Sequence, residues 1–190
     1  MDTTAPGGVY DEDNRARGAT NAEEVTKVLR DLLPDSLVKE ALSSTWDREA
    51  QILGMHPDLV VIHRSSFFHP LNGELGFGSP LFPNDAAKTK WELLYRMADD
   101  KLFSFLGLVG TVRPHTKFLV YSRGTDPNWL KPEFRMRWVT MLEQRFPAVK
   151  GRVTTMLIVG GKAGTFRDPQ VAEELRSHVK RILGLQESVR

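Results

Sequence analysis

Three short runs dominated by apolar residues stand out from the otherwise mixed pattern of the chain. They are LVVI at 59–62, TKFLVY at 116–121 and RVTTMLIV at 152–159, and each is rich in β-branched or aromatic side chains. Runs that are apolar on both faces are typical of buried strands in a parallel sheet. Each run is followed at once by polar residues or Gly, which marks where the strand is expected to end.

The segments around these runs have the apolar spacing of amphipathic helices. Capping residues mark the last of them, because Asp168 is placed to cap the N-terminus, Pro169 to occupy the first helical position and Gly184 to follow the C-terminus. A Pro also begins or ends two of the others. The expected helices are Asn21 to Leu33, Thr45 to Met55, Ala86 to Leu106, Pro132 to just before Pro147, and Asp168 to Leu183.

The alternation of strands and helices predicts an α/β fold, a three-layer doubly wound parallel sheet of the flavodoxin-like kind. We expect four or five strands, because Val9-Tyr10 has the character of a short first strand. The segment Ser36 to Ser43 fits either a second strand or a helical turn. Residues 1–8 are small and polar and are expected to form a disordered lead, with residues 9–190 making one domain.

Composition narrows the functional classes. The 190 residues are 41% hydrophobic and 26% charged, as in ordinary globular proteins, and the net charge of +2 gives no reason to expect a nucleic-acid partner. The absence of Cys excludes disulfides, thiolate nucleophiles and Cys-ligated metals. No apolar signal segment or membrane-length run is present. We therefore expect a soluble, cytoplasmic protein without a membrane partner; cofactor and oligomeric state are not indicated.

Polar residues follow each predicted strand, and right-handed crossovers place all these strand ends at one edge of the sheet. In open α/β sheets this edge is where ligands bind. The backbone at Gly160-Gly161 can approach a ligand closely because neither residue has a side chain. The polar side chains expected there are Asp11, Asp13, Ser43, Ser44, His63, Arg64, Ser65, His69, Ser122, Arg123, Asp126 and Lys162.

His63 ends a buried strand and has two interpretations. It is placed to act as a general base if Asp11, Asp13 or Asp126 orients it, with Ser65 as a nucleophile beside it. Alternatively, His63 is hydrogen-bonded to the backbone at the sheet edge, and Ser65 caps a turn. His63 and His69 are six residues apart in a loop, which is not a metal-ligand spacing.

The cations at this edge suggest an anion site. Arg64 and Arg123 each follow a strand, and two guanidinium groups can clamp a carboxylate or phosphate. Lys162 adds a third positive charge beside Gly160 and Gly161, whereas pairing of the two Arg with Asp11 or Asp13 would leave no site.

The segment from Ser65 to Asp85 is unusually long for a loop and holds four Phe, three Pro and three Gly. We expect it to form an ordered cover over the strand ends. Its Phe side chains are a candidate docking surface for a protein partner.

The order of these features resembles the receiver domains of response regulators. An acidic cluster at Asp11 and Asp13, a helix, a short strand, a helix and PDLVVI follow one another as in that family. The resemblance covers residues 9–64 in pattern and the rest in topology, and it gives Ser122 and Lys162 the positions of the Ser/Thr and Lys of receivers. His63 stands at the phospho-accepting Asp position, so the resemblance implies a degenerate receiver.

No dinucleotide-binding fingerprint, phosphate-binding loop or nucleophile elbow is present in the sequence. Whether the chain is an enzyme is therefore left open. The leading hypothesis is a signalling or regulatory domain that binds a small anionic ligand or partner group at the strand C-terminal edge. The alternatives are a hydrolase that uses His63 with Asp11 or Asp13 under the 65–85 loop, and a protein-interaction module that uses the Phe-rich loop.

Overall fold

A computed structural model of the chain describes residues 23–39, 48–67, 85–123, 128–158 and 166–185. It begins with a helix over residues 23–32. The remaining elements, in chain order, are α2 (Arg48–Met55), β1 (Leu59–His63), the 3-10 helix η1 (Arg64–Phe67), α4 (Asp85–Val112), β2 (Lys117–Arg123), α5 (Pro132–Arg145), the 3-10 helix η2 (Pro147–Val149), β3 (Val153–Ile158) and α6 (Pro169–Leu183).

The three described strands form one parallel sheet in the order β1-β2-β3. β2 lies in the centre, with His63 of β1 opposite Tyr121 and Ile158 of β3 opposite Arg123. β2 therefore continues for two residues past the end of β1. The three apolar runs of the sequence are confirmed as neighbouring parallel strands.

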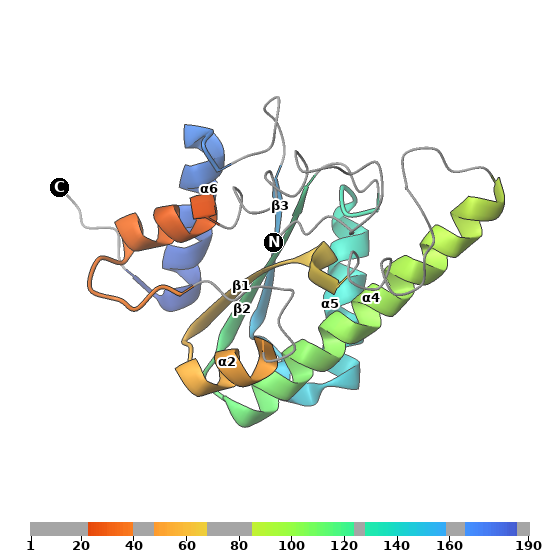
Figure 1. Ribbon diagram of the computed structural model, residues 1–190, viewed down its shortest axis with the longest axis horizontal. Helices are drawn as coiled ribbons and strands as arrows, with labels where there is room; N and C mark the ends of the chain where they lie inside the picture. The colour runs from red at the N-terminus through yellow and green to blue at the C-terminus, as the bar shows by residue number, and fades with distance from the viewer. Residues whose placement is uncertain (1–22, 40–47, 68–84, 124–127, 159–165, 186–190) are drawn as a thin grey trace.

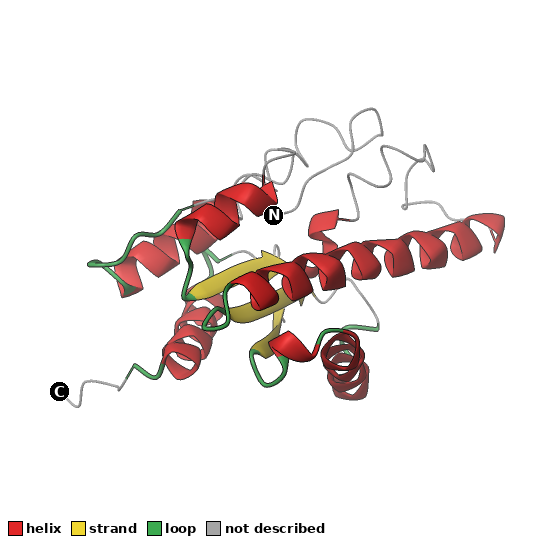
Figure 2. Ribbon diagram, turned by 90° about the horizontal axis from the view of Figure 1, so that it is seen from below, coloured by secondary structure: helices red, strands yellow, loops and turns green. Residues whose placement is uncertain are grey.

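Helices cover both faces of this sheet, as Figure 1 shows with α4 and α5 on one side and α6 on the other. Phe118 and Val120 of β2 pack with α2, α4 and α5, whereas Leu119 and Tyr121 pack with α6 and the 23–32 helix. Figure 2 shows the sheet between these helices from a second direction. The predicted α/β fold with a doubly covered parallel sheet is confirmed, with three strands among the described residues.

The longest helix, α4, extends further than predicted, to Val112 instead of about Leu106. Gly107 and Gly110 are part of it, and they face η2 at very short range. A Cβ at Gly107 would lie within 2.3 Å of the Phe146 ring, and one at Gly110 within 2.4 Å of Val149. These two Gly lie within the helix and allow it to pack closely against the η2 segment.

The predicted ends of α5 and α6 are confirmed. α5 begins at Pro132 and ends at Arg145, before Pro147. Asp168 caps α6 by accepting a hydrogen bond from the Gln170 backbone N–H, and Gly184 follows the helix with a φ of 70°. Only Gly adopts such a left-handed conformation without a steric penalty.

The predicted end of β2 also differs from the structure. β2 includes Ser122 and Arg123, which were expected to follow the strand. These residues stay in the strand because Ser122 and Arg123 pair with Leu157 and Ile158 of β3. Residues 36–39, the described part of the undecided Ser36 to Ser43 segment, form neither helix nor strand.

Several predictions concern residues outside the described part of the chain. They are the disordered lead at 1–8, the short strand at Val9-Tyr10 and the Phe-rich cover beyond Phe67. Among the described residues, no helix combines the length and the apolar character that a membrane span requires.

Candidate functional site

The end of β1 places His63 within the molecule. The side chain is 5% exposed, and its ring meets the Tyr121 ring edge-on at 4.9 Å between centroids. Tyr121 in turn packs edge-on against Phe166, which precedes α6. His63 is thus the first ring in a row of three that closes the α6 side of the sheet near the strand ends.

Arg64, the next residue, points to the opposite layer. Its Nε and Nη2 donate to the two carboxylate oxygens of Asp99 on α4, at 3.1 and 2.7 Å. The guanidinium carbon also lies 5.0 Å from the Trp129 ring centre and 5.2 Å from that of Phe134. Because the side chain is 7% exposed and binds its carboxylate with two parallel hydrogen bonds, Arg64 ties β1 to α4 and α5.

The two Ser residues after Arg64 lie in η1. Ser66 is 2% exposed, and its hydroxyl donates to the His63 carbonyl at 2.6 Å. A Ser that follows a strand commonly caps a turn in this way. Ser65 lies in η1, but its side chain is outside what the structure describes.

Ser122 and Arg123 occupy the projecting end of β2. Ser122 is 6% exposed, and the Arg123 side chain is not among those described. Since Arg123 and Ile158 are paired, the chain leaves β2 and β3 at adjoining positions. Arg123 and Ile158 thus lie side by side at the C-terminal edge of the sheet.

The remaining predicted site residues lie outside the described ranges. They are Asp11, Asp13, Ser43, Ser44, His69, Asp126, Gly160, Gly161 and Lys162. The structure thus brings His63, Ser122 and the backbone of Arg123 to one edge, and it holds Arg64 below that edge against Asp99.

A cavity of about 730 Å³ is lined by Leu59 to Ile62 of β1 and extends over one face of the sheet to Lys117 and Tyr121 of β2. Because its walls come from helices on both faces of the sheet, it also surrounds the outer edge of β1. Sequence reasoning missed it, because the position of the gap depends on which strands are neighbours. It runs from Ser66 and Tyr121 near the strand C-termini to Pro57, Asp58 and Lys117 near the N-termini. Its walls include Val25, Leu29 and Leu33 from the N-terminal helical segment and Ile52 and Met55 from α2.

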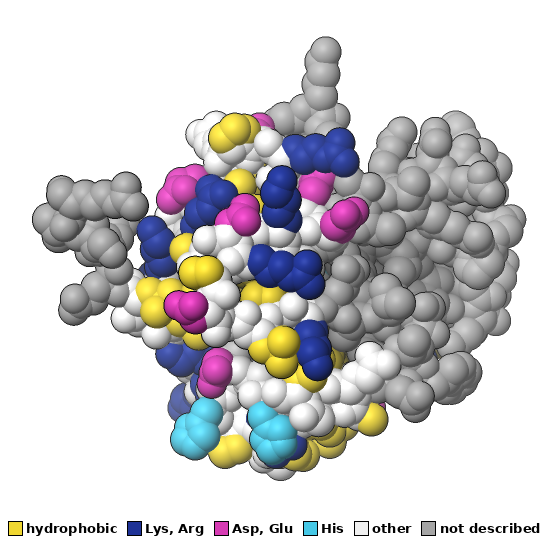
Figure 3. Space-filling model, turned by 60° about the vertical axis from the view of Figure 1, so that its left-hand side comes forward, with side chains coloured by type: hydrophobic (Ala, Val, Ile, Leu, Met, Phe, Trp, Pro, Cys, Tyr) yellow, Lys and Arg dark blue, Asp and Glu magenta, His cyan; other side chains and the backbone are white. Residues whose placement is uncertain are grey.

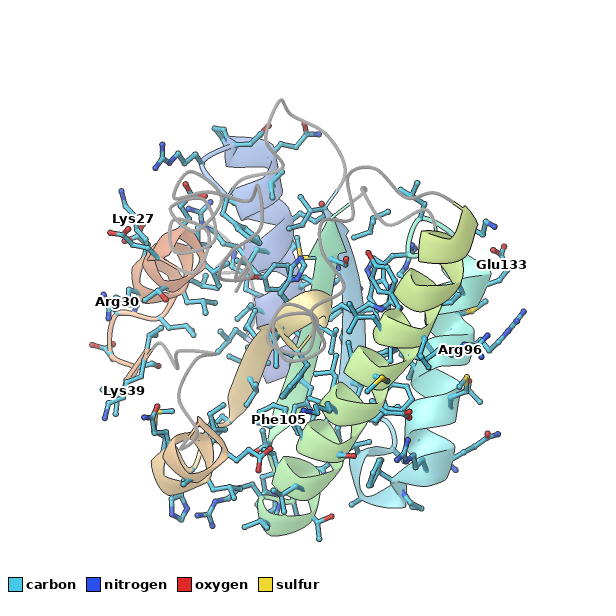
Figure 4. All side chains as sticks on the ribbon, turned by 45° about the vertical axis from the view of Figure 1, so that its right-hand side comes forward. Lys27, Arg30, Lys39, Arg96, Phe105 and Glu133 are labelled. Atoms are coloured by element: carbon cyan, nitrogen blue, oxygen red, sulfur yellow. The ribbon has the colours of Figure 1, made fainter. Side chains whose placement is uncertain are left out.

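Charged groups near this cavity serve mostly structural roles or face solvent. Lys117 Nζ donates to the Ile182 carbonyl at the end of α6, at 2.5 Å. Figure 4 shows Lys27, Arg30 and Lys39 projecting outward from the 23–39 segment, and Figure 3 shows basic side chains spread over this face with hydrophobic ones between them. Within the described ranges, no group of three His, Asp or Glu is arranged to hold a metal.

His178 on α6 has a lowered pKa. Burial lowers the pKa of His178, and the positive charge of Arg181 lowers it further. Arg181 Nη2 lies 2.7 Å from His178 Nδ1, a contact that suits the neutral imidazole. His178 is in the second half of α6, which runs away from the strand C-termini.

The chain matches none of the protein-family models, curated proteins or solved structures with which it was compared. The similarity to receiver domains therefore stays a prediction from the sequence pattern. Function has to be argued from the residues and their surroundings, because a fold alone does not determine it.

Proposed function

We propose that the chain is a signalling or regulatory α/β domain that binds a small anionic ligand at the C-terminal edge of its sheet. The observation that carries this proposal is the pairing of Arg123 with Ile158 at the ends of β2 and β3. Gly160, Gly161 and Lys162 follow Ile158 in the sequence by two to four residues, so we expect them to lie near Arg123. Two cations and the side-chain-free backbone of two Gly would then be close together, an arrangement that suits a phosphate or carboxylate.

The projection of β2 past β1 supports the same location. Because His63 is opposite Tyr121, Ser122 and Arg123 extend beyond the end of β1. In open α/β sheets, ligands bind outside the carboxyl ends of the strands, which is where these two residues lie. We propose in addition that the sheet is flavodoxin-like, with four or five strands in the complete chain.

Arg64 and His63 have supporting roles in this proposal. Arg64 is buried against Asp99 with both sides of its guanidinium fork engaged, so we leave it out of the ligand site. His63 is packed edge-on against Tyr121 at the base of the edge. The hydrolase alternative requires a substrate to reach this ring, and the 5% exposure of His63 does not favour it.

Thermal unfolding in the presence of inorganic phosphate, pyrophosphate and a panel of nucleotides tests the proposal. A ligand at 100 times its dissociation constant should raise the free energy of unfolding by about 2.7 kcal/mol. Arg123→Gln and Lys162→Gln should each reduce that gain. Lys150→Gln removes the same charge from an exposed residue near the opposite edge and should leave the gain unchanged.

Two results would contradict the anion site. One is the absence of a shift with every anion in the panel. The other is an equal shift in the wild type, Arg123→Gln and Lys162→Gln, which would place the bound anion elsewhere on the molecule.

A further inference from the structure

The outer edge of β1 borders an open groove. Among the described residues, β1 pairs with β2 alone, and the cavity of about 730 Å³ follows β1 from Leu59 to Ile62. In Figure 1 the 23–32 helix and α2 extend past this edge, one above and one below the gap beside β1. The gap is thus continuous with the sheet and lies between two helical elements.

Backbone groups of β1 face this gap. The Asp58 carbonyl accepts a hydrogen bond from the Lys117 backbone N–H, so Asp58 directs its hydrogen-bonding groups toward β2. Alternate residues of a parallel strand direct these groups to opposite sides. Leu59 and Val61 therefore direct an N–H and a carbonyl each toward the cavity, and a paired strand would satisfy these four groups.

The gap has apolar side chains on both sides, together with polar ones such as Thr26 and Ser66. Val25 and Leu29 line it from the 23–32 helix, and Ile52 and Met55 line it from α2. These residues belong to the two different core clusters or pack against them. An occupant that extends the sheet would place successive side chains against opposite walls, so it needs apolar residues at neighbouring positions.

We propose that this groove is filled by the chain's own N-terminal segment, with Val9 and Tyr10 paired to the outer edge of β1 as a parallel strand. Val9 and Tyr10 are adjacent apolar residues, one for each wall, and Gly7-Gly8 precede them. Both Val and Tyr are enriched in β-strands, and within residues 1–22 they form an adjacent pair.

The direction of the 23–32 helix supports a parallel strand. Glu24 in its first turn pairs with Arg167, which directly precedes α6 and so lies at the C-terminal edge of the sheet. The helix begins at the edge where a preceding parallel strand would end. The twelve residues 11–22 can span up to about 40 Å, which allows a connection from the strand end to the start of this helix.

The docking has a consequence for the ligand site. A parallel strand at Val9-Tyr10 would bring Asp11 and Asp13 to the C-terminal edge, on the His63 side. The two proposals remain separate, because strand docking does not depend on a ligand and the anion test above does not involve Val9 or Tyr10.

Engineered disulfides test the docking directly, since the chain contains no Cys of its own. Neighbouring parallel strands bring paired Cα atoms within the range that a disulfide can bridge. Because successive side chains of a strand point to opposite faces, Val9→Cys should cross-link to a Cys at one pair of alternate positions in β1, either 59 and 61 or 60 and 62. Tyr10→Cys should cross-link to a Cys at the other pair. Mild oxidation of the full chain followed by non-reducing electrophoresis and peptide mapping measures this, with Thr4→Cys as the control for random collision.

Hydrogen exchange of the full chain provides a second readout that needs no change in β1. In the wild type the Leu59 and Val61 amides should be protected. Val9→Asp/Tyr10→Asp should speed their exchange at least tenfold, and Thr3→Asp/Thr4→Asp, which adds the same charge, should not. Three results would each overturn the proposal. The first is a yield of cross-links no higher than that of Thr4→Cys. The second is cross-linking between molecules, which would assign the groove to another copy, and the third is amide protection that survives Val9→Asp/Tyr10→Asp, which would assign it to a different segment or partner.

Discussion

At the scale of single residues, Arg64 has the clearest role in the described structure. It is the residue after β1, and it binds Asp99 with two hydrogen bonds while lying over the rings of Trp129 and Phe134. Its side chain is 7% exposed and that of Asp99 20%. A buried cation held in this way fixes the position of the strand end relative to α4 and α5.

Replacement of Arg64 by Met should lower the free energy of unfolding by about 3 kcal/mol, because it leaves the Asp99 carboxylate without its partner in a largely buried place. Urea denaturation measures the change. Arg145 and Asp100 form a pair that is 49% and 62% exposed, so Arg145→Met should cost less than about 1 kcal/mol. In Arg64→Met/Asp99→Leu much of the loss should be recovered; equal losses for the single and double variants would contradict this view of the pair.

The residue types at the strand ends were predictable from sequence, but their partners were not. The pattern identified Arg64 as a cation after a buried strand, with Asp11 or Asp13 as its possible carboxylates. Asp99 lies 35 residues further along the chain, in α4. In the sequence, this Asp resembles the polar residues that a helix normally exposes to solvent. Only the packing of α4 across the sheet brings the two together.

At the scale of elements, the contact between α4 and η2 is unusually close. Gly107 and Gly110 let the helix approach Phe146 and Val149 to distances at which no Cβ fits. The sequence predicted the helix and its apolar face well. The predicted helix ended six residues early, because Gly has a low helix propensity and weakens a helix prediction. In the structure the same Gly residues permit close packing.

Gly107→Ala should therefore destabilise the protein by roughly 1–3 kcal/mol, since the added methyl group has to displace the Phe146 ring. Gly54 provides a matched control, because it lies in α2 and a Cβ there meets nothing within 4 Å. Gly54→Ala should stabilise the protein by about 0.5–1 kcal/mol through helix propensity alone. Thermal or urea denaturation of both variants checks the opposite signs; stabilisation by Gly107→Ala would show that the α4–η2 contact relaxes easily.

At the scale of the whole molecule, β2 connects the two halves of the core. Phe118 and Val120 belong to the cluster that contains Trp129 and Trp138, whereas Leu119 and Tyr121 belong to the α6 cluster. The alternation of side chains along one central strand therefore joins both layers. The sequence predicted this arrangement, because its three apolar runs have no polar face.

A destabilising substitution in the α6 layer should also lower the stability of the opposite layer. Leu175 is fully buried in the α6 cluster, and Leu175→Ala should lower the free energy of unfolding by about 2–5 kcal/mol. In a Trp46→Phe/Trp91→Phe background, the fluorescence of Trp129 and Trp138 should shift to a lower urea midpoint together with far-UV circular dichroism. Separate midpoints for the two signals would mean that the layers unfold independently. Glu173→Ala on the exposed side of the same helix serves as the control.

The outer edge of β1, which has no partner strand among the described residues, also bears on how the protein is made. A strand edge without a partner is a template on which other chains can add, and such edges promote aggregation. Residues 1–22 leave the ribosome before β1 does, so the strand that we propose at Val9 and Tyr10 would be available when this edge first folds. A fragment that began at residue 23 would expose the Leu59 and Val61 backbone from the start of folding. The order of segments along the chain would thus protect this edge in the newly made protein.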